Sequence, residues 1–338
     1  MTRQPKKICI LPAQLGLGGP ASFQSGLIRS FKERGVEVTH DPLDPTLTAI
    51  LLFGAARNLA EVRQAQSRGV RLVQRLNGMN WVHRKKFTGV RHFIKAEVGN
   101  IKLRSVRKMV DRVIYQSQFA RDWWEREHGV LDKKQAVIHN GVDLELFTPQ
   151  PPEKPVERYR ILMVEAHHGS GYEQGLHSAV QLLQNLENRL DRPCELAVVG
   201  DVPLSLQQRM NRPGVTWLGV MSHTDIPAID RTAHLFFSGD INATCPNAAL
   251  EAMACGLPVL AYDTGAMREL VPPEAGCVVP YGGNVWELAQ PDEVALAQGA
   301  HVILSGQEEF SRQARQHAQE HFDIRDAAEK YLEILLGD

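Results

Sequence analysis

One carboxylate stands inside a helix of small apolar residues, and it is the first candidate for chemistry in this chain. The segment CPNAALEAMACGLPV, residues 245–259, predicts a helix that begins near Asn247 and carries Glu251 one turn further on. The first N–H groups of that helix, at Ala248 and Ala249, suit an anion such as a diphosphate. The Glu251 carboxylate can accept two hydroxyl hydrogen bonds, as from a ribose. The alternative is a surface carboxylate that interacts only with the helix dipole.

Two glycine turns could bring backbone N–H groups close to phosphate. Gly18 and Gly19 lie in the segment LGLGGPAS, between a predicted strand and a predicted helix. His167 and His168 precede a second turn at Gly169, where successive N–H groups could form an anion nest. Imidazole gains a positive charge below about pH 6.5, so diphosphate affinity is expected to rise as the pH falls from about 7.5 to 6. A plain tight turn and two polar surface histidines are the alternatives.

Positive charge is concentrated in one stretch of a nearly neutral chain. The formal net charge of the 338 residues is −1, yet residues 71–120 hold twelve Lys and Arg and only two acids. Such a local excess attracts phosphate groups, an acidic acceptor or an anionic membrane surface. A solvated helix face is the alternative. No recognisable nucleic-acid motif or row of stacking aromatics accompanies the block, so nucleic acid is not expected as a partner.

Within this block, a helix predicted over residues 92–110 separates charged from apolar side chains. The charged face is expected to serve the acceptor, and it carries Arg91, Lys95 and Lys102. A separate apolar stripe is expected to pack on the sheet, and its members are Ile94, Val98, Ile101 and Met109.

Short apolar segments alternate with helical segments along the whole chain. Helices are predicted between the strands and from about residue 291 to the end. This alternation gives parallel sheets that are covered on both faces, with ligands at the carboxyl ends of the strands. The fold class is therefore α/β, with doubly wound, Rossmann-like domains. Strands are predicted at residues 7–11, 36–39, 49–53, 71–76, 113–116, 160–164, 195–199, 215–218, 234–237, 258–261 and 277–279.

A proline-rich segment divides the chain into two domains. FTPQPPEKPVERYR, residues 147–160, holds four prolines among charged residues and cannot continue a helix or a central strand. The sequence therefore predicts an N-terminal domain over residues 1–147, a linker over 148–159 and a C-terminal domain over 160–320. A hydrophobic content of 43% allows two cores, each for a domain of about 150 residues.

Composition argues against several other classes of protein. No segment approaches the roughly 18 consecutive apolar residues of a membrane span, and the basic N-terminus lacks the features of a secretory signal. A cytoplasmic protein is therefore expected. The five cysteines include no CxxC pair and the 13 histidines no HExxH, so neither a metal nor a cofactor is expected.

Several of these segments, taken in order, resemble the retaining glycosyltransferases of family four, which have the GT-B fold. The resemblance rests on HNGVDLELFTP at residues 139–149, VVGD at 198–201 and CPNAALEAMACGLPVLAYDTGAMRELV at 245–271, and it extends from about residue 8 to about 281. It implies a nucleotide-sugar donor bound between two Rossmann-like domains whose sheets face a central cleft. It also implies a final helix over residues 321–338 that crosses back onto the N-terminal domain.

The resemblance implies roles for individual residues. Glu251 matches the glutamate that holds the nucleotide ribose. The segment that recognises the base corresponds to Gly219, Val220 and Met221. The groups that approach the donor phosphates correspond to Gly18, Gly19, Ala248 and Ala249, and Asn247 at the predicted start of the helix is a further candidate for the donor site.

The chain departs from the family where the donor is usually neutralised or oriented. Ala243 stands at the first glutamate of the Glu-x7-Glu motif, and Asn77 stands near the family's N-domain histidine. Ala166 and Gln174 replace an arginine and a lysine. Loss of one such group typically costs about 3 kcal/mol of transition-state stabilisation. Groups that could substitute are His167, His168, Arg75, His83, Arg84 and the acid Asp240.

The function that follows is retaining transfer of a sugar from a nucleotide-sugar to a glycan, lipid-linked or small-molecule acceptor. Candidate catalytic residues are Glu251, Asp240 and His83. The acceptor is expected on the N-terminal domain, near Arg75, Asn77, Arg84 and the charged helix face. The alternative is a catalytically degenerate GT-B protein that binds a nucleotide-sugar or glycan as a partner subunit. A third interpretation is an epimerase, which would act without an acceptor.

Overall fold

The structure, a computed structural model, describes residues 6–15, 18–56, 58–150, 154–168, 173–187 and 189–337. The predicted site residue Gly169 lies outside these ranges. The chain divides into two compact units. Unit 1 comprises residues 1–81, 89–141 and 324–338, and unit 2 comprises residues 82–88 and 142–323.

The division between the units differs from the predicted boundaries at residues 147 and 160. The chain already joins unit 2 at Val142, whose N–H donates to the Phe322 carbonyl over 2.7 Å. The C-terminal segment from residue 324 returns to unit 1. The boundary between the units therefore lies at the Val142–Phe322 hydrogen bond, which the proline-rich segment does not predict.

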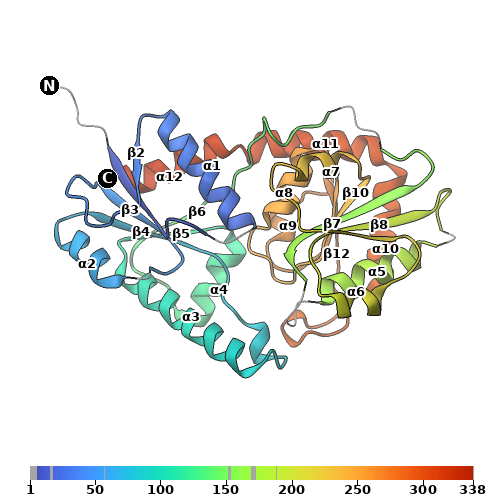
Figure 1. Ribbon diagram of the computed structural model, residues 1–338, viewed down its shortest axis with the longest axis horizontal. Helices are drawn as coiled ribbons and strands as arrows, with labels where there is room; N and C mark the ends of the chain where they lie inside the picture. The colour runs from blue at the N-terminus through green and yellow to red at the C-terminus, as the bar shows by residue number, and fades with distance from the viewer. Residues whose placement is uncertain are drawn as a thin grey trace. The chain divides into compact units, whose positions relative to one another are not determined.

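Unit 1 is built on a six-stranded parallel sheet of order β2-β1-β3-β4-β5-β6 (Figure 1). Its strands are β1 (Lys7–Leu11), β2 (Glu37–Thr39), β3 (Ala49–Phe53), β4 (Arg71–Leu76), β5 (Arg112–Tyr115) and β6 (Lys134–Val137). Its helices are α1 (Gly19–Glu33), α2 (Leu59–Ser67), α3 (Val90–Met109), α4 (Gln118–His128) and α12 (Ile324–Leu336). One core joins the sheet to α1 and α12, and another joins it to α2, α3 and α4. Every residue of β3 is consequently buried.

Unit 2 contains a second six-stranded parallel sheet, of order β12-β11-β10-β7-β8-β9. Its strands are β7 (Tyr159–His167), β8 (Cys194–Asp201), β9 (Val215–Gly219), β10 (Leu235–Ser238), β11 (Val259–Tyr262) and β12 (Gly276–Val279). Its helices are α5 (Gln174–Leu186), α6 (Leu204–Met210), α7 (Ile226–Arg231), α8 (Asn247–Ala254), α9 (Met267–Leu270), α10 (Glu293–Ser305) and α11 (Gln307–His321), with 3-10 turns η1 (Val82–Arg84) and η2 (Val285–Glu287). The predicted α/β class with two parallel sheets is confirmed.

Two arginines hold the end of the last helix against the sheet of unit 1. Arg112 Nη1 donates to the carbonyls of Ile334, over 2.9 Å, and Gly337, over 3.0 Å. Arg71 Nη1 donates to the Leu335 carbonyl over 3.1 Å and also to Gly337. The last carbonyls of a helix have no partner within the helix, and a positive charge there opposes the helix dipole favourably. Part of the positive charge at residues 71–120 is therefore used to dock α12.

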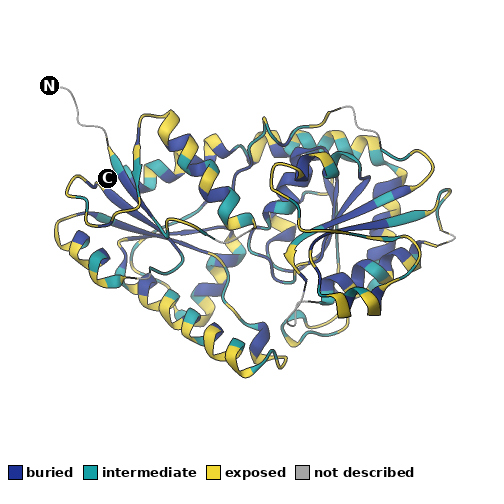
Figure 2. Ribbon diagram, viewed as in Figure 1, coloured by how far each residue is buried: buried dark blue, intermediate teal, exposed yellow. Residues whose placement is uncertain are grey.

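The prediction that the apolar stripe of α3 packs on the sheet is wrong for Ile94, Val98 and Ile101, whose side chains are exposed. Figure 2 shows exposed residues along much of α3. Two polar side chains set the rotation of the helix instead. Asn100 Oδ1 accepts from the Asn80 N–H over 3.0 Å, and Arg107 Nε donates to the Tyr115 hydroxyl over 3.0 Å.

Both of these side chains are buried, together with Ala96 and Val106. Because buried polar groups must be hydrogen-bonded, they turn the opposite, apolar side of α3 towards solvent. Met109 alone of the predicted stripe packs on the core.

We expect Arg112→Ala to destabilise unit 1, because it leaves helix-terminal carbonyls without their charged donor. Hydrogen bonds to charged groups contribute about 1.5–3 kcal/mol each, so the free energy of unfolding should fall by about 2 kcal/mol. Urea unfolding followed by circular dichroism measures this. Arg63→Ala, at an exposed position on α2, is the matched control. Equal stability of the two variants would contradict the proposed role of Arg112 in holding the end of α12.

Candidate functional site

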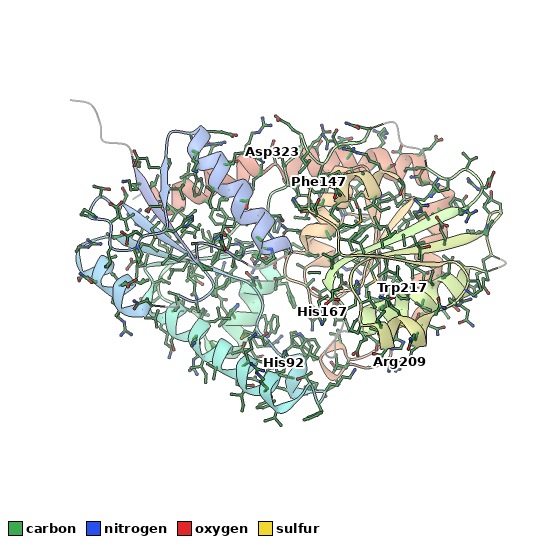
Figure 3. The ribbon with its side chains drawn as sticks, viewed as in Figure 1. His92, Phe147, His167, Arg209, Trp217 and Asp323 are labelled. Atoms are coloured by element: carbon green, nitrogen blue, oxygen red, sulfur yellow. The ribbon has the colours of Figure 1, made fainter. Side chains whose placement is uncertain are left out.

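Glu251 lies one turn inside α8, as the sequence predicts, and its side chain is held by a histidine. Glu251 is 6% exposed, and its Oε1 lies 2.8 Å from Nε2 of His223. Hydrogen bonding to Glu251 raises the pKa of His223 despite the opposing effect of burial. The ring of Phe147 packs on His223 with a centroid distance of 5.1 Å (Figure 3 labels Phe147). The carboxylate is thus fixed in one orientation.

His223 is a residue that the sequence interpretation missed. It follows the predicted base-recognition segment at Gly219, Val220 and Met221 by two residues. Gly219 ends β9 with a φ of 69°, a left-handed conformation that glycine adopts at little cost. The His223–Glu251 contact therefore joins the loop after β9 to the helix after β10. The only sequence signal was a histidine in a loop at the carboxyl end of a predicted strand.

The start of α8 is less open than the sequence suggests. Ala249 is fully buried, and its N–H donates to the Pro246 carbonyl over 3.1 Å. Asn247 is also buried, whereas Ala248 is partly exposed. Of the three residues predicted to face a diphosphate, Ala248 is the one that solvent can reach.

The position of the missing motif glutamate lies under a tight turn. Ala243 is 5% exposed, and its carbonyl accepts from the Ala266 N–H over 2.8 Å. Gly265, with a φ of 61°, passes so close that a Cβ there would lie 2.3 Å from the Ala243 oxygen. Asn242, which precedes Ala243 in the chain, also has a left-handed backbone conformation, with a φ of 57°. Close backbone packing therefore surrounds the position that the family fills with a carboxylate.

A pocket of about 240 Å³ opens at the carboxyl ends of β7 and β10. Its wall includes the titratable side chains of Glu165, Glu173, His177 and Asp240. Lys86 also lines the pocket and pairs with Glu173 over 3.0 Å. The pairing register of β7 shifts between Val164 and His167, and such bulges reorient side chains next to a site. The pocket is therefore rich in carboxylates.

The pKa values of the carboxyl groups of Glu165 and Asp240 are both raised above the usual range. Burial raises the pKa of Glu165 well above its usual range, and the negative charge of Asp240 raises it further. Removal from water raises the pKa of Asp240 to about 6, although a hydrogen bond from the Ile241 N–H opposes this. Asp240 is nevertheless exposed to solvent, so water screens much of this effect. The shift favours the protonated form of Glu165, which is the form that can donate a hydrogen bond.

A contact between two glycines fixes the pocket wall. A Cβ on Gly175 would lie 2.3 Å from the Gly239 carbonyl oxygen, and a Cβ on Gly239 would lie 2.9 Å from the Gly175 Cα. Only glycine at both positions allows the start of α5 to approach the loop after β10 this closely. Gln174 precedes Gly175 and Asp240 follows Gly239 in the chain. The close contact of the two glycines therefore positions Gln174 and Asp240 along the pocket.

The structure separates the two histidines that were predicted to bind the diphosphate together. His168 is fully buried, its Nε2 lies 3.2 Å from the Val199 carbonyl, and burial lowers its pKa. It therefore cannot provide positive charge to a ligand near neutral pH, which corrects the sequence interpretation. His167 (labelled in Figure 3) is half exposed, but its Nδ1 lies 3.0 Å from Asp201. That carboxylate would compete with an anion for the imidazole.

Arg75 is enclosed in unit 1 and is not available to an acceptor. It is 1% exposed, and its guanidinium lies between the rings of Phe23 and Phe53, at 4.8 and 4.9 Å from their centroids. It donates to Asn77 over 2.9 Å and to Asn140 over 2.7 Å. Arg75 therefore organises the carboxyl end of β4, a correction to its predicted place on the acceptor side.

The remaining predicted residues are divided between buried and exposed positions. His83, a predicted catalytic residue, is 4% exposed within η1, which leaves its ring little access to a substrate. Arg84, beside it, is exposed, as are Arg91, Lys95 and Lys102 on α3. Gly18 precedes α1 with a φ of 102° and accepts from the Ala21 N–H over 3.0 Å. Gly19 is the first residue of α1.

The described residues contain neither a cluster suited to a metal ion nor a helix suited to span a membrane. In that part of the chain, no three His, Cys, Asp or Glu side chains group closely enough to hold a metal ion. No helix there is long and apolar enough to cross a membrane. The expectations of no metal, no cofactor and a cytoplasmic location remain predictions.

The two parallel sheets and their strand orders define the GT-B fold, and solved structures share it. Sucrose-phosphate synthase from Thermosynechococcus elongatus superposes with a TM-score of 0.73 at 16% identity, over 97% of this chain and 98% of that chain. The HepE protein of Anabaena, solved with UDP and glucose, superposes with a TM-score of 0.68 at 18% identity, over 98% and 99% of the two chains.

Family models match both halves of the chain. Residues 22–146 match the model described as Glycosyltransferase Family 4, and residues 158–306 match that of Glycosyl transferases group 1. The chain belongs to the glycosyltransferase family that these two models describe.

Two curated relatives match part of the chain. The 2-deoxystreptamine glucosyltransferase of Streptomyces kanamyceticus is 26% identical over 163 residues, 46% of this chain and 41% of the relative. The gpi3 subunit of the phosphatidylinositol N-acetylglucosaminyltransferase of Schizosaccharomyces pombe is 20% identical over 229 residues, 65% of this chain and 47% of the relative. The matched part of this chain thus spans less than half the length of either relative.

We expect Asp240→Asn to stabilise the protein at neutral pH. A carboxyl whose pKa is raised to about 6 in the folded state contributes stability at low pH, and that contribution is lost as the pH rises through about 6. Asparagine stays neutral, so the variant should gain up to about 1 kcal/mol over the wild type at pH 7.5, after allowance for solvent screening. The gain should vanish near pH 4.

Thermal denaturation of both proteins between pH 4 and 8 measures this difference. Asp132→Asn, at an exposed position of unit 1, controls for the loss of one surface charge. A gain that does not depend on pH would contradict the raised pKa.

Proposed function

We propose that this chain is a retaining glycosyltransferase that takes a sugar from a nucleotide-sugar bound to unit 2. The observation that carries the proposal is the His223–Glu251 contact, which fixes a carboxylate beside the segment that the family uses for base recognition. Glu251 would accept the ribose hydroxyls, and Gly219 to Met221 would contact the base. The pocket at Glu165 and Asp240 lies at the carboxyl ends of strands in the same sheet.

The names of the similar proteins narrow the choice of donor and acceptor. HepE was also solved with UDP-glucose, so UDP-sugars come first among the donors to be tested. The matched relatives transfer glucose or N-acetylglucosamine, as their names state, to 2-deoxystreptamine and to phosphatidylinositol. A glycan, lipid-linked or small-molecule acceptor is compatible with this range. The family membership does not favour the alternative of a partner subunit that only binds.

The chemistry of the donor site would rest on neutral and backbone donors more than on cations. A departing diphosphate needs hydrogen-bond donors, and the positions of the family's arginine and lysine hold Ala166 and Gln174. Glu165 in its protonated form would donate one such bond, and Ala248 at the start of α8 another. The Asp240 carboxylate, once ionised, would face the positive charge that develops on the sugar.

A thermal-shift screen against UDP-, GDP-, ADP- and dTDP-sugars identifies the donor, because a ligand at a hundred times its Kd adds about 2.7 kcal/mol of stability. The anomeric configuration of the product, read by NMR, then tests retention. Conversion of the nucleotide-sugar without any acceptor would show an epimerase instead. Binding of a nucleotide-sugar without transfer to any class of acceptor would support the alternative of a protein that binds the nucleotide-sugar but does not catalyse transfer.

We expect Glu251→Ala to weaken nucleotide-sugar binding by about tenfold or more without unfolding the protein, since it removes a charged hydrogen-bond acceptor. Calorimetric titration with the donor found in the screen measures the affinity, and circular dichroism checks the fold. Glu274→Ala, at an exposed position in the same unit, should bind as the wild type does. An unchanged affinity of Glu251→Ala would remove Glu251 from the site.

A further inference from the structure

A short segment, residues 82–88, belongs to unit 2 although the residues before and after it in the sequence belong to unit 1. It begins with Val82, which is buried and lines the pocket at the carboxyl ends of β7 and β10. The Val82 carbonyl accepts from the N–H groups of Lys85 and Lys86, each over 2.9 Å. These two hydrogen bonds close a tight turn, which fixes the backbone of both lysines next to a residue of the pocket wall.

The side chains of the two lysines have different surroundings. Lys85 pairs with Glu287, and the two side chains are 37% and 58% exposed. Lys86 lines the pocket and pairs with Glu173, whose side chain is only 22% exposed. An ammonium group has three N–H donors, and the pair with Glu173 uses one of them. The other donors of Lys86 stay available to a ligand in the pocket.

Further positive charge lies near the start of α5. Burial lowers the pKa of His177 in the pocket wall, and the positive charges of Arg209 and Lys86 lower it further. Arg209, labelled in Figure 3, belongs to α6. Gln174 and Gly175, the first two residues of α5, also line the pocket, and the N–H groups at the start of a helix carry a partial positive charge.

An anion in this pocket depends on a cation, because acids also line the wall. Burial favours the uncharged form of Glu165, and water screens the exposed Asp240. Lys86 is the one Lys or Arg among the described residues that line the pocket. Removal of its charge should therefore affect an anionic ligand more than a neutral one.

We propose that Lys86 binds the diphosphate of the nucleotide-sugar, held at the pocket by the turn after Val82 and by the Glu173 carboxylate. The inference rests on the proposed function, because it assigns a further residue to the same donor site. A lysine ammonium acts on phosphate as a compact point charge, and it stabilises the negative charge that develops on a departing diphosphate. Lys86 thus adds a cation to the neutral and backbone donors of that site, and it comes from a segment outside the sheet of unit 2.

Calorimetric titration of the full chain tests the proposal, with whichever of UDP, GDP, ADP and dTDP stabilises the protein most. Lys86→Ala should weaken binding of that diphosphate by about tenfold or more, because a charged hydrogen bond is lost. Lys86→Arg retains the charge and should keep most of the affinity. The corresponding nucleoside, which has no phosphate, should bind Lys86→Ala and the wild type equally well in a displacement titration.

Lys85→Ala is the matched control, since Lys85 lies in the same turn and also forms an ion pair but does not line the pocket. It should bind the diphosphate as the wild type does. An equal loss in Lys85→Ala, an unchanged affinity of Lys86→Ala, an equal loss of nucleoside binding, or a Lys86→Arg variant as weak as Lys86→Ala would overturn the role of Lys86 and leave the proposed function intact. Failure of the wild type to bind any of the four diphosphates would contradict the proposed function together with this inference.

Discussion

Parallel strand pairing is the constraint on which the arrangement of this protein depends. A parallel pair needs a crossover connection, so all loops that follow the strands of one sheet emerge at the same edge. In unit 2 this places Glu165 near the end of β7, the His223 loop after β9 and Asp240 after β10 at one edge of the sheet. The approach of Gly175 to Gly239 then closes the gap between α5 and the loop after β10. The topology of the sheet therefore determines where the candidate site lies, and the individual side chains determine its chemistry.

Within that edge, the distribution of charge differs from what a diphosphate site ordinarily requires. Carboxyl groups line the pocket, and the histidine next to the β7 bulge is buried with a lowered pKa. Burial acts against this charge, since it raises the pKa of Glu165 and so favours its uncharged form. In the proposed donor site, groups whose charge depends on their surroundings would therefore stand in place of fixed cations.

Unit 1 uses its excess of positive charge for two different purposes. Arg71, Arg75, Arg107 and Arg112 are bound to carbonyls, amides, rings or a hydroxyl of the same unit. The exposed cations of α3 instead lie on the same helix as its exposed apolar residues Ile94, Val98 and Ile101. A count of charges along the sequence cannot distinguish these two groups, because guanidinium side chains are long enough to reach either inward or outward.

The sequence by itself determined the α/β class, most strands and the place of Glu251 within its helix. These features depend on local periodicity and on short motifs, which are read directly from neighbouring residues. It missed β6, because KQAV at Lys134–Val137 is short and only partly buried. Only the tertiary structure decided the burial of Arg75, His83 and His168, the rotation of α3 and the partnership of His223 with Glu251. Each of these depends on contacts between residues far apart in the chain, and periodicity carries no information about which buried partner a polar side chain will find.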